Sequence, residues 1–270
     1  MTTTPDGTPF TDLVTLARTV ADEVSVRLLD ALEGEGPAVT SKSTVTDLVT
    51  DLDTWAERHI TERLLGVRPD DGLIGEEGAS IDSTSGVTWC VDPIDGTVNF
   101  VHGLPGFNVS LAAQVDGRSV AAVVTSPLHR DTFTATLGGG ATRNDQPIRC
   151  ATPASLERAV IGTGFGYDPD RRRRQAEVLT RVIPRIADIR RGGAAALDLC
   201  WIACGRLDGY WEVGLNPWDH AGGALIAREA GARVEGPAGG DASAELVVAA
   251  PPVIFDHLVA LLDEVRAADV

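Results

Sequence analysis

The most informative stretch of the sequence is Trp89–Phe100, WCVDPIDGTVNF. Its apolar start predicts a short β-strand that delivers Asp92 to its end, because the proline that follows cannot donate to a strand ladder. Asp95 comes next, then Gly96, which permits close approach of another backbone, and Thr97, which suits the start of a helix. We therefore expect two carboxylates and a helix N-terminus at the end of one strand.

Such an arrangement combines two kinds of binding. Carboxylate oxygens hold hard cations, and the exposed N–H groups of a helix start can hold a phosphate. An isolated Asp-x-x-Asp is more often a turn in which aspartate binds the backbone. The complete twelve-residue string is far more specific, and it predicts a site for a divalent cation beside a phosphate group.

Two further acidic features lie at the ends of expected elements. Glu76 and Glu77 follow a short apolar run in LIGEEG, and Asp219 lies in NPWDHAGG at the expected start of a helix. A glutamate pair alone is usually solvated surface, and an aspartate there is favourable with the helix dipole without any further role. The three acidic segments together, in this order, favour one shared site.

Working outward, the chain predicts helices alternating with strands, which is typical of helices packed on mixed sheets. The dipeptide Asp116-Gly117 between two apolar runs predicts a hairpin, and Gly66 is expected to cap the second helix. The expected helices are 10–32, 52–65, 171–186, 194–204, 217–230 and 255–267, and the main expected strands are 87–91, 109–115, 120–125, 132–136, 160–163, 210–213 and 246–249.

Composition limits the class of protein. A length of 270 residues predicts one compact unit with two sub-domains, approximately 1–150 and 151–270. A net charge of −16 argues against a general nucleic-acid binder or a protein of anionic membranes. The N-terminus lacks a signal-peptide pattern, no apolar run approaches the length of a membrane span, and the four cysteines show no paired spacing. A cytoplasmic protein without a membrane partner is expected.

The quoted segments carry a resemblance. LIGEEG, WCVDPIDGTVNF and NPWDHAGGALIAREAGARV resemble the three signature stretches of the inositol monophosphatase family, at the family's separations. Thr46–Asp53 (TDLVTDLD) resembles a fourth stretch, and Arg190–Gly214 resembles the substrate-side region of bacterial members. The resemblance covers Phe10 to Leu262 and implies an α/β (α+β) layered αβαβα sandwich of the sugar-phosphatase type.

The resemblance also implies a metal site with two or three Mg²⁺ ions. Glu76, Asp92 and the carbonyl of Ile94 would bind a first ion, and Glu77 would assist a weaker additional one through water. The second ion would be bound by Asp92, Asp95 and Asp219. Lithium sensitivity and a homodimer are further properties that the resemblance implies.

The remaining roles follow from the same resemblance. Asp53 and Thr97 would orient and deprotonate a water, with Glu76 also in the catalytic set. Gly96 and Thr97 would contact the phosphate through backbone N–H groups. The polyol hydroxyls would face Asp95, Ala195, Glu212 and Asp219.

Some positions depart from the family pattern or allow two readings. Ala194 stands where many members have threonine, which removes a hydroxyl near the substrate. Arg190 and Arg191 form either a solvated rim or a basic group near the substrate. The run 171–174 (RRRR) reads as a solvated helix start or a partner surface, and Lys42 could lie near the acidic site.

The expected reaction is Mg²⁺-dependent hydrolysis of myo-inositol monophosphate, a small phosphorylated polyol, to inositol and phosphate. The alternatives with the same chemistry are histidinol phosphate, a 3′-phosphorylated nucleotide and fructose bisphosphate. The segment Tyr210–Glu212 resembles inositol-type members more than histidinol-phosphate members. An alternative of a different class is a binding module that works with the transcription machinery; the acidic charge weakens direct nucleic-acid binding, and the complete acidic set favours an enzyme.

Overall fold

The computed structural model describes residues 2–34, 39–41 and 48–270. Lys42, which the sequence analysis considered as a neighbour of the acidic site, lies outside the described residues, as do Thr46 and Asp47 at the start of the fourth family-like stretch. The helices are α1 (Phe10–Glu33), α2 (Asp51–Val67), α3 (Thr97–Val101), α4 (Pro169–Val182), α5 (Ala195–Ala203), α6 (Pro217–Glu229) and α7 (Pro252–Glu264). Single 3₁₀ turns span Leu156–Arg158, Ile183–Arg185, Pro237–Gly239 and Ala267–Asp269.

Two large sheets form the framework. The eight-stranded sheet has the order β10-β9-β8-β7-β6-β5-β3-β4 and is antiparallel except between β3 and β5. The five-stranded sheet has the order β12-β11-β13-β15-β14, with β11 parallel to both β12 and β13. The bounds are β3 (Gly72–Gly75), β4 (Ser80–Ile81), β5 (Val87–Asp95), β6 (Asn108–Val115), β7 (Arg118–Ser126), β8 (Asp131–Thr136), β9 (Gly140–Arg143), β10 (Gln146–Pro147), β11 (Val160–Thr163), β12 (Asp188–Arg190), β13 (Gly209–Glu212), β14 (Arg233–Glu235) and β15 (Val247–Ala250), beside the short pair β1 (Val39–Ser41) and β2 (Leu48–Thr50).

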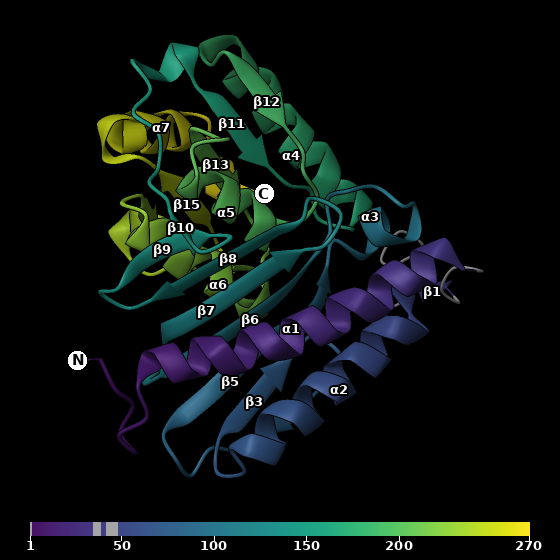
Figure 1. Cartoon of the computed structure of the whole chain (residues 1–270). Helices are drawn as coiled ribbons and strands as arrows, with labels where there is room; N and C mark the ends of the chain where they lie inside the picture. Colours follow the sequence, from purple (N-terminus) through teal and green to yellow (C-terminus); the bar gives the residue numbers. More distant parts are fainter. Residues whose placement is uncertain (1, 35–38, 42–47) are drawn as a thin grey trace.

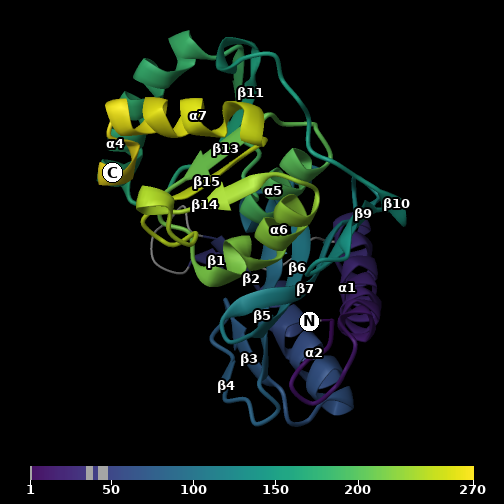
Figure 2. The same cartoon turned by 90° about the vertical axis from the view of Figure 1, so that its left-hand side faces the viewer.

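The layers alternate as the sequence predicted. Helices α1 and α2 lie across the front of the eight-stranded sheet in Figure 1, while α5 and α6 lie between the two sheets. Helices α4 and α7 cover the outer face of the five-stranded sheet (Figure 2). The order is therefore helix, sheet, helix, sheet, helix, which confirms the αβαβα sandwich.

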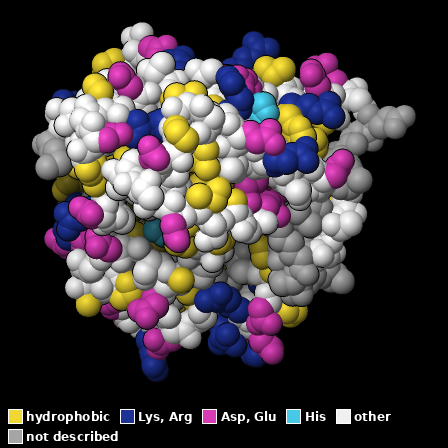
Figure 3. Space-filling view, turned by 90° about the horizontal axis from the view of Figure 1, so that it is seen from below, with side chains coloured by type: hydrophobic (Ala, Val, Ile, Leu, Met, Phe, Trp, Pro, Cys, Tyr) yellow, Lys and Arg dark blue, Asp and Glu magenta, His cyan; other side chains and the backbone are white. Residues whose placement is uncertain are grey.

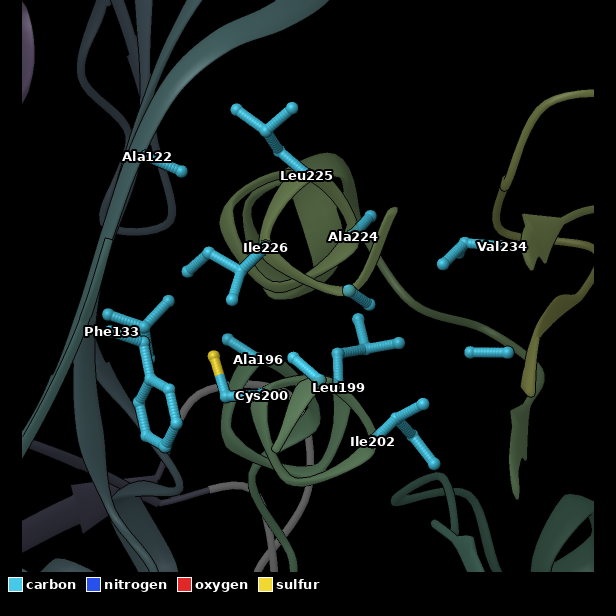
Figure 4. Packing of buried hydrophobic residues seen from close by; sticks show 14 of the residues in the cluster. Ala122, Phe133, Ala196, Leu199, Cys200, Ile202, Ala224, Leu225, Ile226 and Val234 are labelled. Atoms are coloured by element: carbon cyan, nitrogen blue, oxygen red, sulfur yellow. The ribbon is translucent and has the colours of Figure 1, made fainter. Parts of the chain in front are cut away.

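The middle layer, α5 and α6, packs against both sheets. Ala196 and Cys200 of α5 and Ile226 of α6 point toward Phe133 of the eight-stranded sheet, while Val234 closes the opposite side (Figure 4). Small residues permit this: a Cβ added at Gly223 of α6 would lie 2.6 Å from the carbonyl oxygen of α5 residue 196. The two helices that carry Ala195 and Asp219 are thereby fixed to both sheets.

Most expected elements are confirmed, and the boundary errors have local causes. The hairpin at Asp116-Gly117 forms with φ of 50° and 73°, as the primed turn requires. The prediction that Gly66 caps α2 was wrong, since the helix continues to Val67 and Arg68 follows it. The helix expected from 255 begins at Pro252, whose fixed φ suits the first turn.

No helix in the described part of the chain is both long and apolar enough to cross a bilayer. Acidic and basic side chains lie interspersed over the face shown in Figure 3.

Candidate active site

Strand β5 carries both aspartates of the central motif, and a bulge directs them to the same side. Asp92 pairs with Ser110 of β6 and Asp95 pairs with Asn108, so the four residues 92–95 of β5 oppose the three residues 108–110 of β6. Without the bulge, residues three apart would point to opposite faces of the sheet. The expectation that the strand ends at Asp92 was therefore wrong: the proline lies inside the bulge, where its missing N–H is tolerated.

The turn after β5 leads directly into α3. Gly96 has φ of 87°, and a Cβ there would lie 2.8 Å from the carbonyl oxygen of Gly106, so no other residue fits without displacement. Thr97 begins the helix, as predicted. Its Oγ1 lies 3.2 Å from Oδ1 of Asp53 and 3.1 Å from the carbonyl oxygen of Ile94.

Asp53 lies behind Thr97 and not on the wall of the cavity described below. It is fully buried in the first turn of α2. Its Oδ2 accepts hydrogen bonds from the Thr50 backbone N–H at 2.8 Å and the Thr50 hydroxyl at 2.6 Å. One carboxylate oxygen therefore caps the helix while the other faces Thr97.

The glutamate pair is divided by the turn that follows β3. Glu76 lines the cavity, whereas Glu77 is not among the lining residues. Glu57 of α2 holds this turn, because its two carboxylate oxygens accept from the backbone N–H groups of Glu77 at 2.7 Å and Ala79 at 2.9 Å. The position of Glu76 thus depends on a buried side chain from another element.

Asp219 and Asp95 are held by backbone N–H groups of the middle helices. Oδ2 of Asp219 accepts from Asn216 N–H at 2.7 Å in the first turn of α6. Asp95 accepts from Ala195 N–H at 3.2 Å and Ala196 N–H at 2.9 Å, at the start of α5. Its second partner at Oδ2 is the Asn108 side-chain amide at 2.8 Å, so this carboxylate joins β5, β6 and α5.

These segments meet at one cavity of about 430 Å³, a size suited to a small ligand. The cavity brings together residues more than a hundred positions apart. The predicted site residues that line it are Glu76, Asp92, Ile94, Asp95, Gly96, Thr97, Ala195, Glu212 and Asp219.

Burial and mutual repulsion dominate the electrostatics. Loss of solvent, followed by the charges of Glu76 and Asp95, raises the pKa of Asp92 well above its ordinary value. Burial raises the pKa of Asp95 to about 7 and also raises that of Asp219. Burial raises the pKa of Glu212 as well, although the hydroxyl of Tyr210 donates a hydrogen bond to it.

The donor chemistry of this cluster fits a hard divalent cation. Glu76, Asp92, Asp95 and Asp219 supply carboxylates to the cavity wall, and Ile94 on the same wall has a backbone carbonyl. These are the oxygen ligands that Mg²⁺ and Ca²⁺ take, and a bound cation would relieve the repulsion that raises the pKa values of the aspartates. The carboxylate side chains are not arranged around a common position for an ion. Within the described ranges, no three His, Cys, Asp or Glu side chains stand around one position where an ion could be held.

Sequence reasoning missed the supporting residues Glu57 and Asn108. Both are buried polar side chains, at 5% and 0% exposure. Glu57 lies one helical turn after Asp53 on a face otherwise buried, and a charged side chain at such a position is a detectable signal. Asn108 offers no such signal, because a polar residue at a strand start is ordinary.

Comparison with known proteins agrees with this geometry. Residues 10–267 match the model of the inositol monophosphatase family. Inositol-1-monophosphatase SuhB of Mycobacterium tuberculosis is 48% identical over 241 residues, covering 85% of this chain and 82% of the relative. Nus factor SuhB of Pasteurella multocida is 43% identical over 224 residues, covering 81% and 84%.

A solved structure gives the same result in three dimensions. The extragenic suppressor protein suhB from Bartonella henselae superimposes with a TM-score of 0.87 at 36% identity, covering 93% of this chain and 98% of the other. Family match, sequence identity and fold all agree with the acidic cavity. The chain is therefore a phosphatase that belongs to the inositol monophosphatase family.

Proposed function

We propose that this phosphatase depends on Mg²⁺ and hydrolyses myo-inositol monophosphate to inositol and phosphate. The observation that carries the proposal is the convergence of three acidic segments and the Gly96–Thr97 helix start on one cavity. Phosphate monoesters are anions that bare carboxylates repel, so an acidic cavity suits them only when cations are bound.

The cation ligands follow from the cavity wall. Glu76, Asp92 and the Ile94 carbonyl form one group, and Asp92, Asp95 and Asp219 form a second, with Asp92 shared. Bound Mg²⁺ neutralises phosphate charge, lowers the pKa of water and stabilises the leaving oxygen. Asp95 is already oriented for this by its three N–H donors.

Thr97 and Asp53 form the base that we assign to the attacking water. The Thr97 hydroxyl is within reach of Asp53 Oδ1, and Asp53 is fixed by Thr50. When the hydroxyl donates to Asp53, its oxygen lone pairs face outward and can accept a hydrogen bond from water. Glu76, which also lines the cavity, completes the catalytic set.

Phosphate and polyol would occupy different walls. The backbone N–H groups at Gly96 and Thr97 suit the phosphate, since α3 begins there. The ring hydroxyls would contact Asp95, Ala195, Glu212 and Asp219, all on the cavity wall. Ala194 contributes no hydroxyl to this wall, so the carboxylates carry the hydrogen bonding to the ring. The homodimer that the resemblance implies belongs to the same proposal, and sedimentation at several protein concentrations tests it.

Phosphate release from a substrate panel tests the function. Inositol 1-phosphate, histidinol phosphate, a 3′-phosphorylated nucleotide and fructose bisphosphate are each assayed with Mg²⁺, with EDTA, and with Mg²⁺ restored. We expect the highest kcat/KM for inositol 1-phosphate and no turnover in EDTA. Turnover that persists in EDTA would contradict the cation proposal, and preference for another substrate would replace inositol phosphate.

A further inference from the structure

Asn99 belongs to the most informative stretch of the sequence, yet the chemistry proposed above does not use it. It lies in α3 and is buried, with 7% of its surface exposed. Its side-chain Nδ2 lies 2.8 Å from the carbonyl oxygen of Gly106 and 2.9 Å from that of Gly192. Because both neighbours are acceptors, the amide donates both of its N–H groups to them.

The two carbonyl groups belong to different walls of the cavity. A Cβ added at Gly96 would lie 2.8 Å from the Gly106 oxygen, so this carbonyl lies against the turn that begins α3, which is the phosphate wall. Gly192 directly precedes residues 193–195, which line the cavity and end at Ala195 on the polyol wall. One side chain therefore connects the phosphate wall to the polyol wall, across 93 positions of the sequence.

The backbones of the two walls meet around this amide, and glycines leave the room for it. A Cβ added at Gly106 would lie 2.6 Å from Asn99 Nδ2, and one added at Gly193 would lie 3.1 Å from the same atom. At Gly96, a Cβ would lie 3.1 Å from both the Gly193 oxygen and the Cβ of Ala194. A displacement of the amide therefore changes how the two walls fit together.

The phosphate wall is held in place without Asn99. The Thr97 hydroxyl lies 3.2 Å from Asp53 Oδ1 and 3.1 Å from the Ile94 carbonyl oxygen. Both contacts fix the start of α3, and neither involves the amide. We therefore expect the phosphate wall to keep its position when the amide is removed.

The polyol wall depends on Asn99 through residues 192–194. These residues lead into α5, whose first turn is held by Asp95. The Gly192 carbonyl ahead of that turn is held by the amide. Loss of the amide should therefore displace residues 192–194, two of which line the cavity.

We propose that Asn99 is a positioning residue that sets the polyol wall relative to the phosphate wall, so that the ring and the phosphate of one substrate fit both walls at once. This inference rests on the proposed function and adds to it a residue that determines specificity. A displacement of about 1 Å can lower a rate about 10²-fold. The competing explanation is that the amide only pairs two backbone carbonyls and stabilises the fold.

Two variants of Asn99 separate hydrogen-bond donation from the filling of space. Asn99→Asp keeps the size of the side chain but places a carboxylate, which has no N–H group, against the two carbonyl oxygens. It should lower kcat/KM for inositol 1-phosphate by about 10-fold or more, and at least as much as Asn99→Ala does. The same value for an aryl phosphate, which needs only the phosphate wall and the cations, should change less than about 3-fold in both variants.

Two outcomes of these assays would overturn the inference. Equal losses on both substrates would mean that Asn99 only supports the fold. A wild-type preference in Asn99→Asp, together with a loss in Asn99→Ala, would mean that the side chain fills space and that its N–H groups are not needed.

Gly106→Ala reaches the same contact from the other side. Its added methyl group would displace the amide, and the variant should show the same loss of preference for inositol 1-phosphate. Because both substitutions act through one contact, Asn99→Ala combined with Gly106→Ala should lose little more than the larger single loss, and losses that multiply would contradict the shared contact. Phe100→Leu is the control: this ring is fully buried beside Phe107, so the variant should melt at a lower Tm and keep the wild-type preference.

Equilibrium binding separates this inference from the proposed function. Calorimetry in Ca²⁺, which takes the same oxygen ligands as Mg²⁺, measures the affinities for inositol 1-phosphate and for the aryl phosphate, and Asn99→Asp should lower only the first. If the wild type releases no phosphate from any substrate in Mg²⁺, the proposed function fails, while that selective loss of affinity still supports the positioning role. If the wild type prefers another substrate of the panel, that substrate takes the place of inositol 1-phosphate in both measurements. Affinities that fall equally, or that do not fall, overturn the positioning role whatever the turnover.

Discussion

Strands β5 and β6 present one face to α1 and α2 and the other to α5 and α6, and the two faces are built differently. The first face is wholly apolar and fully buried. The second begins in the same way, with Cys90 and Ala112, and then becomes polar at Asp92 and Asp95 and at their partners on β6. The residues of the first face are Val87, Trp89, Val91, Ile94, Val109, Leu111 and Ala113.

The second face lowers the stability of the fold, and the first does not. On the apolar face the one polar side-chain atom, Nε1 of Trp89, has a partner, since it donates to Asp71 Oδ2 at 3.0 Å. On the other face, Asn108 Oδ1 and Ser110 Oγ are buried without a hydrogen-bond partner, and the aspartates repel one another. Each unpaired polar atom costs about 1–3 kcal/mol. Such local cost is expected at a functional site that the surrounding core holds in place.

The largest expected effect comes from changing one residue on each face. Asp92→Asn should remove nearly all turnover, because Asp92 belongs to both proposed groups of cation ligands. In EDTA the variant should nevertheless melt at or above the wild-type Tm, because the substitution removes one of several carboxylates that repel one another. Val91→Ala, on the adjacent position of the apolar face, should lower the free energy of unfolding by about 2 kcal/mol and keep kcat.

Assays of phosphate release and thermal melts of both variants decide this comparison. Normal Mg²⁺-stimulated turnover in Asp92→Asn would contradict the assignment of the cation site. A fall in Tm as large as that of Val91→Ala would mean that Asp92 supports the fold.

Thr97 tests the base that lies next to the polar face. Thr97→Ala should lower kcat by about 10²-fold, the size of a lost general-base relay. Thr97→Ser keeps the hydroxyl that reaches Asp53 and should recover most of the rate. The Mg²⁺ concentration for half-maximal activity should stay the same in both, and a change confined to that concentration would remove Thr97 from the base.

The sequence predicted the layers and the acidic clusters well, because each rests on local signals. Apolar periodicity marked α1 and α6, and the Asp116-Gly117 turn fixed a hairpin. The bulge that turns Asp95 to the same face as Asp92 has no local signal beyond its proline, since the register with β6 creates it. For the same reason Asn108 was missed, and Arg171 was interpreted as part of a solvated helix start or a partner surface although it lines the cavity: both positions depend on distant residues that folding brings beside them.

Glu212 tests the specificity of the polyol wall. Its carboxyl is buried and accepts from the Tyr210 hydroxyl. Glu212→Gln should lower kcat/KM for inositol 1-phosphate by about 10- to 150-fold, through loss of a charged hydrogen bond to the ring. An aryl phosphate has no ring hydroxyls, and its hydrolysis should barely change. Equal losses on both substrates would assign Glu212 to the support of the cation site.

A variant of Asn108 tests whether β6 influences cation binding through its hydrogen bond to Asp95. Its amide donates to Asp95 while its oxygen is unpaired, so burying it has a cost that only the donor offsets. Asn108→Ala leaves Asp95 with its two backbone donors, and we expect the Mg²⁺ concentration for half-maximal activity to rise up to about 10-fold. Ala112→Gly, four residues further along β6 on the same face, is the control for loss of packing. A fall in Tm without any change in Mg²⁺ response would make Asn108 purely structural.

The smallest expected effect lies away from both faces, at His129 after β7, and it depends on pH. Burial lowers the pKa of His129 below its ordinary value of 6.5, and its Nδ1 lies 3.0 Å from the Ser126 hydroxyl. Because the unfolded chain takes up this proton first, the contribution to stability is complete above pH 6.5 and falls as the pH drops from 6.5 toward the lowered folded pKa. His129→Gln cannot titrate, so the difference in Tm between the wild type and the variant should shrink or reverse as the pH falls from 7.5 to 5.5. Melts in EDTA across this range measure it, because the acidic face is the same in both proteins and its own titration cancels in the difference. A difference in Tm that stays constant with pH would contradict the lowered pKa.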